Sequence, residues 1–264
     1  MKIAIIQPIF KNWDYNSRVN QALELLSKLP KDRIDLIVLP ELFPGSYVPL
    51  QEKAIELGSY ICCGETIRIN DKEFYNASTI INPTGEKNYT HIKNILAPGE
   101  KNHNYITKIN YNVFNINSIN IGISICHELP MLPELGLSYF SRIELLLVPS
   151  LAIKSMLQYW HYHLIIKAIE IGVPVVFVNY AGTFKDKEYE MGGGRSGVYL
   201  PLPEYLESLE DLIKSKHSNP EDLCLFSLPD EEKIKIFNVQ IERYSEYKEE
   251  LIKLREKFRK KLIK

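Results

Sequence analysis

The sequence predicts a protein of the α/β class, and two observations lead to that prediction. Short apolar runs rich in β-branched residues alternate with stretches of helical periodicity. The second half of the chain also repeats the plan of the first, since Gly122–Cys126 loosely echoes Ile3–Gln7. In the same way Glu144–Ser150 echoes Asp35–Glu41, although echoes this short also arise by chance among buried strands. If the echo is genuine, two similar α/β halves pack together.

Strand and helix signals follow one another through the first half. Lys2–Gln7 is a short apolar run and predicts a strand. Arg18–Leu29 carries apolar residues at a spacing of three and four, which predicts an amphipathic helix that begins near Asn16 or Ser17. A proline ends a second buried strand at Asp35–Leu39. Further strands are predicted at Tyr60–Gly64, Ala77–Ile81 and Lys87–Thr90, the last two joined by the turn Asn82-Pro-Thr-Gly85.

The same signals recur in the second half. Strands are expected at Asn120–Ile125, Glu144–Val148 and Pro174–Asn179, and helices at Pro133–Arg142 and Lys154–Ile171. Loops rich in Gly, Pro and charged residues are expected at Gly182–Arg195 and Ser215–Leu223. No Ser/Gly-rich linker divides the chain. We therefore predict a single domain over residues 1–264, with a C-terminal helical extension from about residue 243.

The amino-acid composition restricts the possible binding partners and the expected cellular compartment. A formal net charge of −1 over 264 residues argues against nucleic acid as a partner, because phosphate binding needs clustered Lys and Arg. The basic end, Lys253–Lys264, is interleaved with apolar residues and a glutamate at helical spacing, so we interpret it as a solvated helix. No apolar stretch approaches the roughly 20 residues needed to cross a bilayer. Four cysteines are too few for a disulfide scaffold, so a soluble protein of a reducing cytoplasm is expected.

Three reactive side chains stand where predicted strands run out into loops. Glu41 follows a buried strand, where partial desolvation raises a carboxyl pKa toward the range of a general base. Cys126 ends another apolar run, and Lys93 follows the predicted hairpin. Its ammonium is expected to lower the pKa of the Cys126 thiol, and Glu100 to fix that ammonium or orient the base. Together these groups supply a base, a nucleophile and a fixed positive charge, a set that can split a carbon–nitrogen bond.

Each of these residues also has a plain structural interpretation. A lone cysteine is most often a buried structural thiol, which is how we interpret Cys62, Cys63 and Cys224. Glu41 could instead be an acid at a helix N-terminus, and lysines are usually solvated. Ser124 half-resembles the nucleophile of a serine hydrolase, but the second glycine of that sharp turn is absent and Ser124 falls inside a predicted strand.

Three motifs occur in order along the chain. The first is Pro40-Glu41-Leu42-Phe43, with Gly45 and Tyr47 close behind. The second comprises Lys93, Leu96, Pro98, Gly99 and Glu100. The third comprises Gly122, Cys126, Glu128 and Pro133-Glu134. Taken together, and with weaker echoes from residue 1 to about residue 242, they give a sequence that resembles the nitrilase superfamily of carbon–nitrogen hydrolases.

The resemblance implies both a fold and a site. The implied fold is a four-layer α-β-β-α sandwich with two mixed β-sheets, and the implied catalytic residues are Glu41, Lys93, Cys126 and Glu100. The substrate-binding residues are expected to be His127, Glu128 and Tyr47. The resemblance implies no metal or organic cofactor, and it implies a homodimer or higher homo-oligomer. Two departures from the family's pattern leave the identity of the substrate open. His127 stands where the family usually has Tyr or Trp, and Pro203–Leu223 resembles an insertion or a divergent segment.

The expected function is hydrolysis of a small linear amide, of the amidase or ω-amidase type, through a cysteine thioester. Glu41 would take the thiol proton, and the Lys93 ammonium and the backbone N–H of His127 would hold the oxyanion. Three reactions on the same fold stay open as alternatives: nitrile hydrolysis, N-carbamoyl cleavage and amide-forming acyl transfer. A non-catalytic homologue that binds a ligand is a further alternative.

Overall fold

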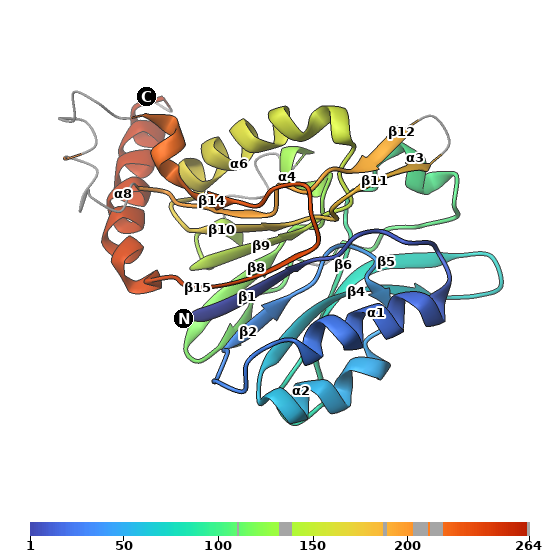
Figure 1. Cartoon of the computed structure of the whole chain (residues 1–264). Helices are drawn as coiled ribbons and strands as arrows, with labels where there is room; N and C mark the ends of the chain where they lie inside the picture. The colour runs from blue at the N-terminus through green and yellow to red at the C-terminus, as the bar shows by residue number, and fades with distance from the viewer. Residues whose placement is uncertain (110, 132–138, 187–188, 203–210, 212–218, 263–264) are drawn as a thin grey trace.

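The computed structural model describes the chain except for residues 110, 132–138, 187–188, 203–210, 212–218 and 263–264. Two large β-sheets pack face to face, and helices cover their outer faces (Figure 1). Both sheets contain parallel and antiparallel neighbours. The predicted α/β class and the two-sheet sandwich with outer helices are therefore confirmed.

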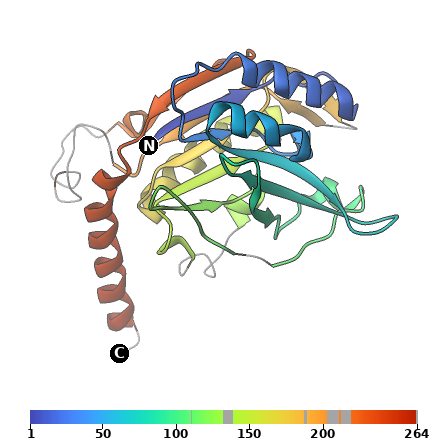
Figure 2. The same cartoon turned by 90° about the horizontal axis from the view of Figure 1, so that it is seen from below.

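The first sheet has the strand order β15-β1-β2-β4-β5-β6, with the short β3 paired to β4. Its strands are β1 (Lys2–Gln7), β2 (Leu36–Val38), β3 (Pro44–Gly45), β4 (Tyr60–Arg68), β5 (Phe74–Ile81), β6 (Lys87–Ile92) and β15 (Lys233–Asn238). Two helices, α1 (Tyr15–Ser27) and α2 (Gln51–Leu57), cover its outer face (Figure 2). Strands β1, β2 and β4 run parallel, so their carboxyl ends lie at one edge of the sheet.

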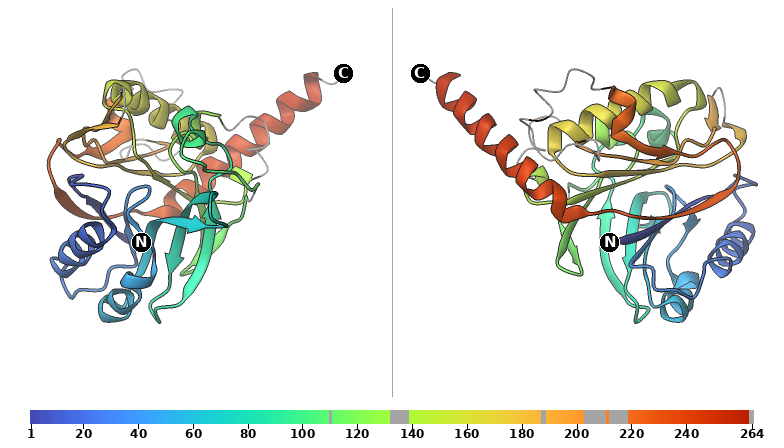
Figure 3. Two further views of the ribbon diagram at one scale, coloured as in Figure 1. Left: turned by 90° about the vertical axis from the view of Figure 1, so that its right-hand side faces the viewer. Right: turned by 60° about the vertical axis from the view of Figure 1, so that its left-hand side comes forward.

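The second sheet has the order β14-β13-β10-β9-β8-β7. Its strands are β7 (Phe114–Ile116), β8 (Ile119–Ile123), β9 (Leu145–Pro149), β10 (Val175–Val178), β13 (Gly197–Tyr199) and β14 (Cys224–Ser227). Helix α6 (Leu157–Ile171) packs on its outer face, and the short α3 (Pro98–Lys101) and α4 (Glu128–Met131) follow β6 and β8. Helix α8 (Ser245–Leu262) extends away from the body of the molecule as an arm (Figure 3).

The alternation of side chains along β1 explains why the first sheet has two apolar faces. Ile3 and Ile5 lie in the core between the two sheets, whereas Ala4 and Ile6 lie in the core beneath α1 and α2. Successive residues of a strand point to opposite faces, so an unbroken apolar run fits a strand covered on both sides. Fully burying one such isoleucine contributes roughly 1.5–3 kcal/mol.

The ends of α1 and α6 differ slightly from those predicted. Asp14 accepts a hydrogen bond from the Ser17 N–H at 2.7 Å, so α1 begins at Tyr15, one to two residues before the predicted start. The predicted helix Lys154–Ile171 begins instead with a single 3₁₀ turn, and α6 ends at Ile171 as predicted, followed by Gly172, whose φ of +70° suits a glycine.

One predicted loop was wrong, and two predictions lie largely outside the described residues. Within Gly182–Arg195, β11 (Thr183–Asp186) and β12 (Tyr189–Gly192) form a separate antiparallel pair, and their exposed, charged residues hid the strand signal. The predicted helix Pro133–Arg142 and the divergent segment 203–223 fall mostly among the residues that the structure leaves undescribed. Within the described part of the chain, no helix has the length and apolar character that a bilayer crossing requires.

Candidate active site

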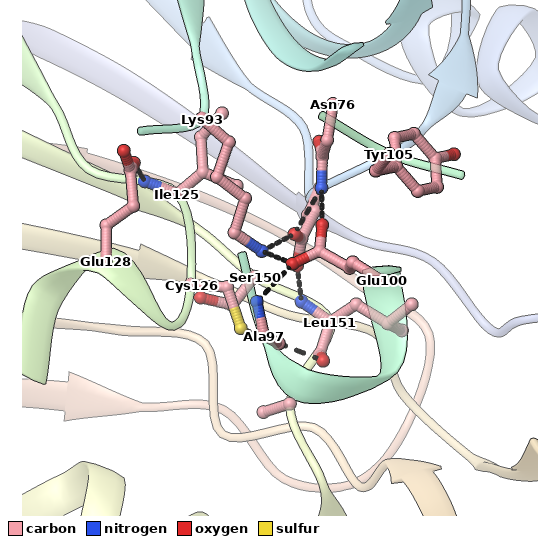
Figure 4. A network of polar contacts seen from close by, with 12 residues as sticks. Asn76, Lys93, Ala97, Glu100, Tyr105, Ile125, Cys126, Glu128, Ser150 and Leu151 are labelled. Carbon is pink, nitrogen blue, oxygen red and sulfur yellow. Dashed lines mark hydrogen bonds and ion pairs between the residues drawn. The ribbon is translucent and has the colours of Figure 1, made fainter. Parts of the chain in front are cut away.

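The candidate residues meet where strands of both sheets end. Glu41 follows β2, Lys93 directly follows β6, and Cys126 lies three residues beyond β8. The structure brings Glu41, Lys93 and Glu100 into direct contact and places the Cys126 thiol beside them (Figure 4). Lys93 is 1% exposed and Cys126 is 7% exposed. Four side chains that sequence analysis selected from three separate motifs therefore form one buried cluster.

The Lys93 ammonium lies between two carboxylates. Its Nζ is 2.6 Å from Glu41 Oε1 and 2.7 Å from Glu100 Oε2. The Nδ2 of Asn76 donates to both acids, at 2.8 Å to Glu41 and 2.5 Å to Glu100. Glu100 also accepts from the Ala97 N–H at 2.6 Å, because it lies in the first turn of α3, where backbone N–H groups are free to bond a carboxylate. These bonds fix the two acids and the ammonium in one geometry.

Leu151 connects the thiol to the carboxylate through its backbone. The Leu151 N–H donates to Glu41 Oε2 at 2.7 Å, and the Cys126 thiol donates to the Leu151 carbonyl at 3.8 Å. Leu151 follows β9 of the second sheet, whereas Glu41 follows β2 of the first. The hydroxyl of Tyr180, which follows β10, donates to the Glu41 carbonyl at 2.8 Å. The site is therefore held together by bonds that cross between the two sheets.

The backbone at the thiol is strained. Cys126 has a φ of +47°, in the left-handed region that residues with a Cβ seldom adopt. Its N–H donates to the Pro149 carbonyl at 3.0 Å, which ties the turn to the end of β9. This sharp turn presents the sulfur toward Leu151 at the edge of the cluster (Figure 4).

The charge of the cluster favours uptake of a proton. Burial raises the pKa of Glu41; the Lys93 ammonium opposes this and the Glu100 carboxylate adds to it, and the net result is a raised pKa. Burial alone would lower the pKa of Lys93, but the carboxylates of Glu41 and Glu100 outweigh it and raise that pKa. Two carboxylates and one ammonium carry a net negative charge, so one further proton would neutralise the cluster. Glu41 is the carboxyl group suited to accept it.

Burial keeps the thiol protonated. It raises the pKa of Cys126, and the Glu41 carboxylate raises it further. The Lys93 ammonium lowers this pKa, as the sequence predicts, but it does not outweigh the other two effects. A base is therefore needed to take the thiol proton.

Glu128, predicted to bind substrate, is occupied within the protein. It is 1% exposed, and His91 Nε2 lies 3.0 Å from its Oε2. The Asn94 N–H and side-chain amide donate to Oε1 at 2.5 and 2.9 Å, and the Ile125 N–H donates to Oε2. In Figure 4 the carboxylate turns toward Ile125 and away from the Lys93 ammonium. Glu128 thus connects the residue after Lys93 to the residue before Cys126, which gives it a positioning role.

The other two predicted substrate-binding residues differ in their surroundings. His127 is half-buried, and burial together with the Lys93 charge lowers its pKa, so its ring is neutral. Among the residues that the structure describes, none accepts a hydrogen bond from the His127 backbone N–H. The Tyr47 ring is half-buried, and the Lys87 ammonium lies over it, 4.7 Å from the ring centroid. Contact of either residue with a substrate stays a prediction.

A cavity of about 490 Å³ is lined in part by Leu42, the residue after Glu41. Its walls come from the start of α1, from the segment after Glu41 and from the loop after α3, and include Trp13, Tyr15, Arg18, Leu42, Ser46 and Tyr105. Its volume falls in the range of roughly 300–1,000 Å³ typical of small-molecule sites. Tyr47 is not one of its lining residues.

Sequence analysis missed three residues of the site. Asn76 lies inside β5, and a polar residue in an otherwise buried strand was the available signal for it. Leu151 acts through backbone atoms only, so no side-chain pattern marks it. Arg18 lies on the predicted α1 helix, where a cation is ordinarily read as a solvated group.

A buried carboxylate, ammonium and thiol thus lie together at the strand ends of a two-sheet sandwich. A sequence model described as carbon-nitrogen hydrolase matches residues 2–202, and the chain belongs to this family. The resemblance to the nitrilase superfamily is thereby confirmed. None of the curated proteins is similar enough in sequence to match the chain.

Solved structures of the family share the fold at low sequence identity. A carbon-nitrogen hydrolase from Helicobacter pylori G27 is 16% identical with a TM-score of 0.78, over 100% of this chain and 98% of that one. XC1258, a CN-hydrolase superfamily protein from Xanthomonas campestris, is 18% identical with a TM-score of 0.75, over 100% and 97%. An amidase from Nesterenkonia sp. AN1 is 16% identical with a TM-score of 0.74, over 92% and 94%. At these identities the likeness shows the fold alone.

Proposed function

We propose that the protein hydrolyses the carbon–nitrogen bond of a small linear amide, with Cys126 as the nucleophile. One observation carries the proposal: a buried carboxyl group with a raised pKa, Glu41, is bridged by Leu151 to a protonated thiol and contacts a fixed ammonium, Lys93. A base, a nucleophile and a stabiliser of negative charge are thus present in one pocket.

The first half of the reaction would form a thioester. Glu41 accepts the thiol proton, and the Cys126 sulfur attacks the amide carbon, so that the carbonyl oxygen becomes an oxyanion. The Lys93 ammonium and the backbone N–H of His127 hold that oxyanion. When the carbon–nitrogen bond breaks, Glu41 returns the proton to the leaving nitrogen, and ammonia departs.

The second half would release the acid. Glu41 takes a proton from a water molecule, whose oxygen attacks the thioester carbon. Collapse of the second oxyanion frees the carboxylic acid and returns the sulfur to the enzyme, where the proton from Glu41 restores the thiol. Glu100 holds the Lys93 ammonium throughout, because its carboxylate lies 2.7 Å from Nζ. Every proton is moved by side chains of this chain and by the water that reacts.

The solved relatives support an amide as the substrate. In the E41Q mutant of the Nesterenkonia sp. AN1 amidase, the acetamide moiety of fluoroacetamide adds covalently to the active-site cysteine, so that cysteine is nucleophilic and lies within reach of a small amide. That observation belongs to the other protein, and the shared fold and the strand-end position of Cys126 support a nucleophilic cysteine here as well. We further propose a reducing cytoplasm as the compartment, in keeping with four free cysteines, and a homo-oligomer in which the α8 arm takes part.

Ammonia release from a panel of linear amides tests the proposal. Cys126→Ala should lose turnover to the background rate while its melting temperature and near-UV circular dichroism stay close to those of the wild type. Cys224→Ala is the matched control, since this thiol lies outside the cluster, and it should keep its activity. Mass spectrometry of the quenched wild type should find the acyl group on Cys126. Ammonia release by Cys126→Ala would refute the mechanism, and cleavage of nitriles or carbamoyl compounds but not amides would refute the substrate class.

A further inference from the structure

The side-chain amide of Asn76 is completely buried, and only one of its two ends has partners. Its Nδ2 donates one hydrogen bond to Glu41 Oε1 at 2.8 Å and another to Glu100 Oε1 at 2.5 Å (Figure 4). Its Oδ1 is also buried and has no hydrogen-bond partner in the described part of the chain, which costs stability. The opposite orientation of the amide would point Oδ1 at two carboxylates, which would repel it. The position therefore requires the two N–H groups.

The hydrogen bonds around Glu41 leave one oxygen open. A carboxylate accepts about four hydrogen bonds, two on each oxygen. On Glu41, the Lys93 Nζ at 2.6 Å and the Asn76 Nδ2 fill both positions of Oε1. The Leu151 N–H, at 2.7 Å, fills one position of Oε2. No donor from the residues that the structure describes fills the second position of Oε2, so Glu41 can accept a proton there.

A single residue links the open oxygen to the thiol. Leu151 holds Glu41 Oε2 through its N–H, and its carbonyl accepts from the Cys126 thiol at 3.8 Å. Glu100 has no such link, because its Oε2 accepts from Lys93 at 2.7 Å and from the Ala97 N–H at 2.6 Å. The proton of the thiol therefore has a short route to Oε2 of Glu41 and none to Glu100 through these contacts.

Asn76 also keeps the two acids from sharing a proton. Glu41 and Glu100 both contact one ammonium, that of Lys93, and two carboxylates held close together tend to retain a proton between them. The Asn76 amide bonds to the Oε1 atoms of both acids and cannot release its own protons. Burial raises the pKa of Glu41, and the hydrogen bond from Asn76 is among the contacts that oppose this rise. Asn76 thus favours an unprotonated Glu41 at rest.

We propose that Asn76 is a positioning residue of the reaction: by filling Oε1 of Glu41 and separating the two acids, it directs the thiol proton to Oε2. In that step the S–H bond of Cys126 breaks and an O–H bond forms on Oε2. The electron pair left on the sulfur then attacks the amide carbon. This inference rests on the proposed function for the identity of the base and the nucleophile. Asn76 acts through Glu41 and does not itself react.

The pH profile of amide hydrolysis tests the proposal. Asn76→Ala should lower kcat by roughly 10- to 100-fold, the effect of losing a hydrogen bond to a charged group, and should change KM little. The acid limb of its kcat/KM profile should move to higher pH, because loss of the donor raises the pKa of Glu41 further. Asn76→Ser keeps one donor, so its acid limb should lie between the two, and it serves as the second variant should Asn76→Ala not fold.

Ser78→Ala is the matched control. Ser78 lies two residues further along β5 on the same face, is equally buried, and its Oγ has no partner among the described residues. This variant should keep the kcat and the acid limb of the wild type. An unchanged kcat in Asn76→Ala would overturn the proposal. A lower kcat with an unmoved acid limb would also overturn it, because Asn76 would then support only the fold.

Alkylation of Cys126 by iodoacetamide gives a measurement that needs no turnover. The sulfur displaces iodide while Glu41 takes the thiol proton, and peptide mass spectrometry locates the label. The rate should rise with pH as Glu41 ionises, and this rise should move to higher pH in Asn76→Ala. If the wild type hydrolyses no amide but this shift is found, the role of Asn76 stands and the proposed function fails. If amides are hydrolysed and the wild-type and Asn76→Ala profiles coincide, the role of Asn76 fails and the proposed function stands.

Discussion

Glu41 and Glu128 are two buried carboxylates near strand ends, Glu41 after β2 and Glu128 after β8. Their pKa values are shifted in opposite directions. They are 3% and 1% exposed, and burial alone would raise the pKa of each. The pKa of Glu41 is raised, because burial, with the nearby Glu100 carboxylate, outweighs the Lys93 ammonium that the two acids share. The pKa of Glu128 is lowered, because its pairing with His91 and its backbone N–H donors outweigh burial. Burial is thus common to both, and the neighbouring charges decide which one can accept a proton.

The difference in pKa fits the two roles that we propose: Glu41 as the base of the reaction and Glu128 as a residue that positions the backbone. A base must gain a proton during the reaction and lose it again, so its anionic form must not be too stable. A carboxylate that holds backbone segments in place must stay ionised. Two substitutions, and the pH dependence of the two variants, test this comparison, and the tests are ordered by the size of the expected effect.

The largest effect is expected from Glu41→Gln, which removes the proton acceptor and keeps the shape. We expect kcat to fall by roughly 10²- to 10⁴-fold, since that is the usual contribution of a positioned general base. The protein should remain folded, because Gln can still accept from the Leu151 N–H. Ammonia release and the melting temperature are measured side by side, with the exposed Glu24→Gln as control. An activity within tenfold of the wild type would exclude Glu41 as the base.

The next effect is expected from Glu128→Gln and concerns stability. Removing the charge leaves His91 and the donors of Asn94 and Ile125 without their anion, which should lower the free energy of unfolding by roughly 3 kcal/mol. Urea denaturation measures this loss, and Glu41→Gln is the matched comparison. If Glu128→Gln unfolds at the same urea concentration as the wild type, the carboxylate does not hold these segments.

The smallest effect is a difference in pH dependence between the same two variants. The pKa of Glu128 lies below the ordinary value of 4.5, so its stabilising contribution is present above that value and is lost as the pH falls through the folded pKa. The stability gap between the wild type and Glu128→Gln should therefore narrow from about pH 7 to about pH 3.

For Glu41 the sign is reversed. Its pKa lies above 4.5, so the folded wild type binds this proton more tightly than the unfolded chain and loses that advantage as the pH rises. Relative to the wild type, Glu41→Gln should become more stable with rising pH. Urea denaturation repeated across the pH range measures both trends. For each variant, the quantity compared is its difference from the wild type in free energy of unfolding. If this difference changes with pH in the same direction for both variants, the opposite pKa shifts of Glu41 and Glu128 are contradicted.

Much of the site could be predicted because its side chains follow strands. Glu41, Lys93 and Cys126 each stand after an apolar run, and the carboxyl ends of strands gather at one edge of an α/β sheet. Glu128 also lies in a motif, but its function depends on which donors surround it. His91 and Asn94 come from a different sheet, and their contact with Glu128 follows from how the sheets stack rather than from sequence spacing.

The parts of the fold that escaped prediction have mixed local signals. The edge strand β15 alternates Lys and apolar residues at Lys233–Phe237, a pattern of period two that we had not assigned. The β11–β12 pair is exposed and charged, so it lacks the apolar face that marks a strand. The buried strand β1 was predicted with its observed bounds, because burial on both faces gives it a continuous apolar run.

Cys126, the proposed nucleophile, has a left-handed backbone conformation. Folding favours glycine at this position, whereas the proposed reaction needs cysteine. Glycine adopts a φ of +47° without the steric cost of roughly 1–2 kcal/mol that a residue with a Cβ incurs there. A screen of random variants for thermal stability alone should therefore enrich variants with glycine in place of Cys126. Cysteine would survive such a screen only if turnover were selected at the same time.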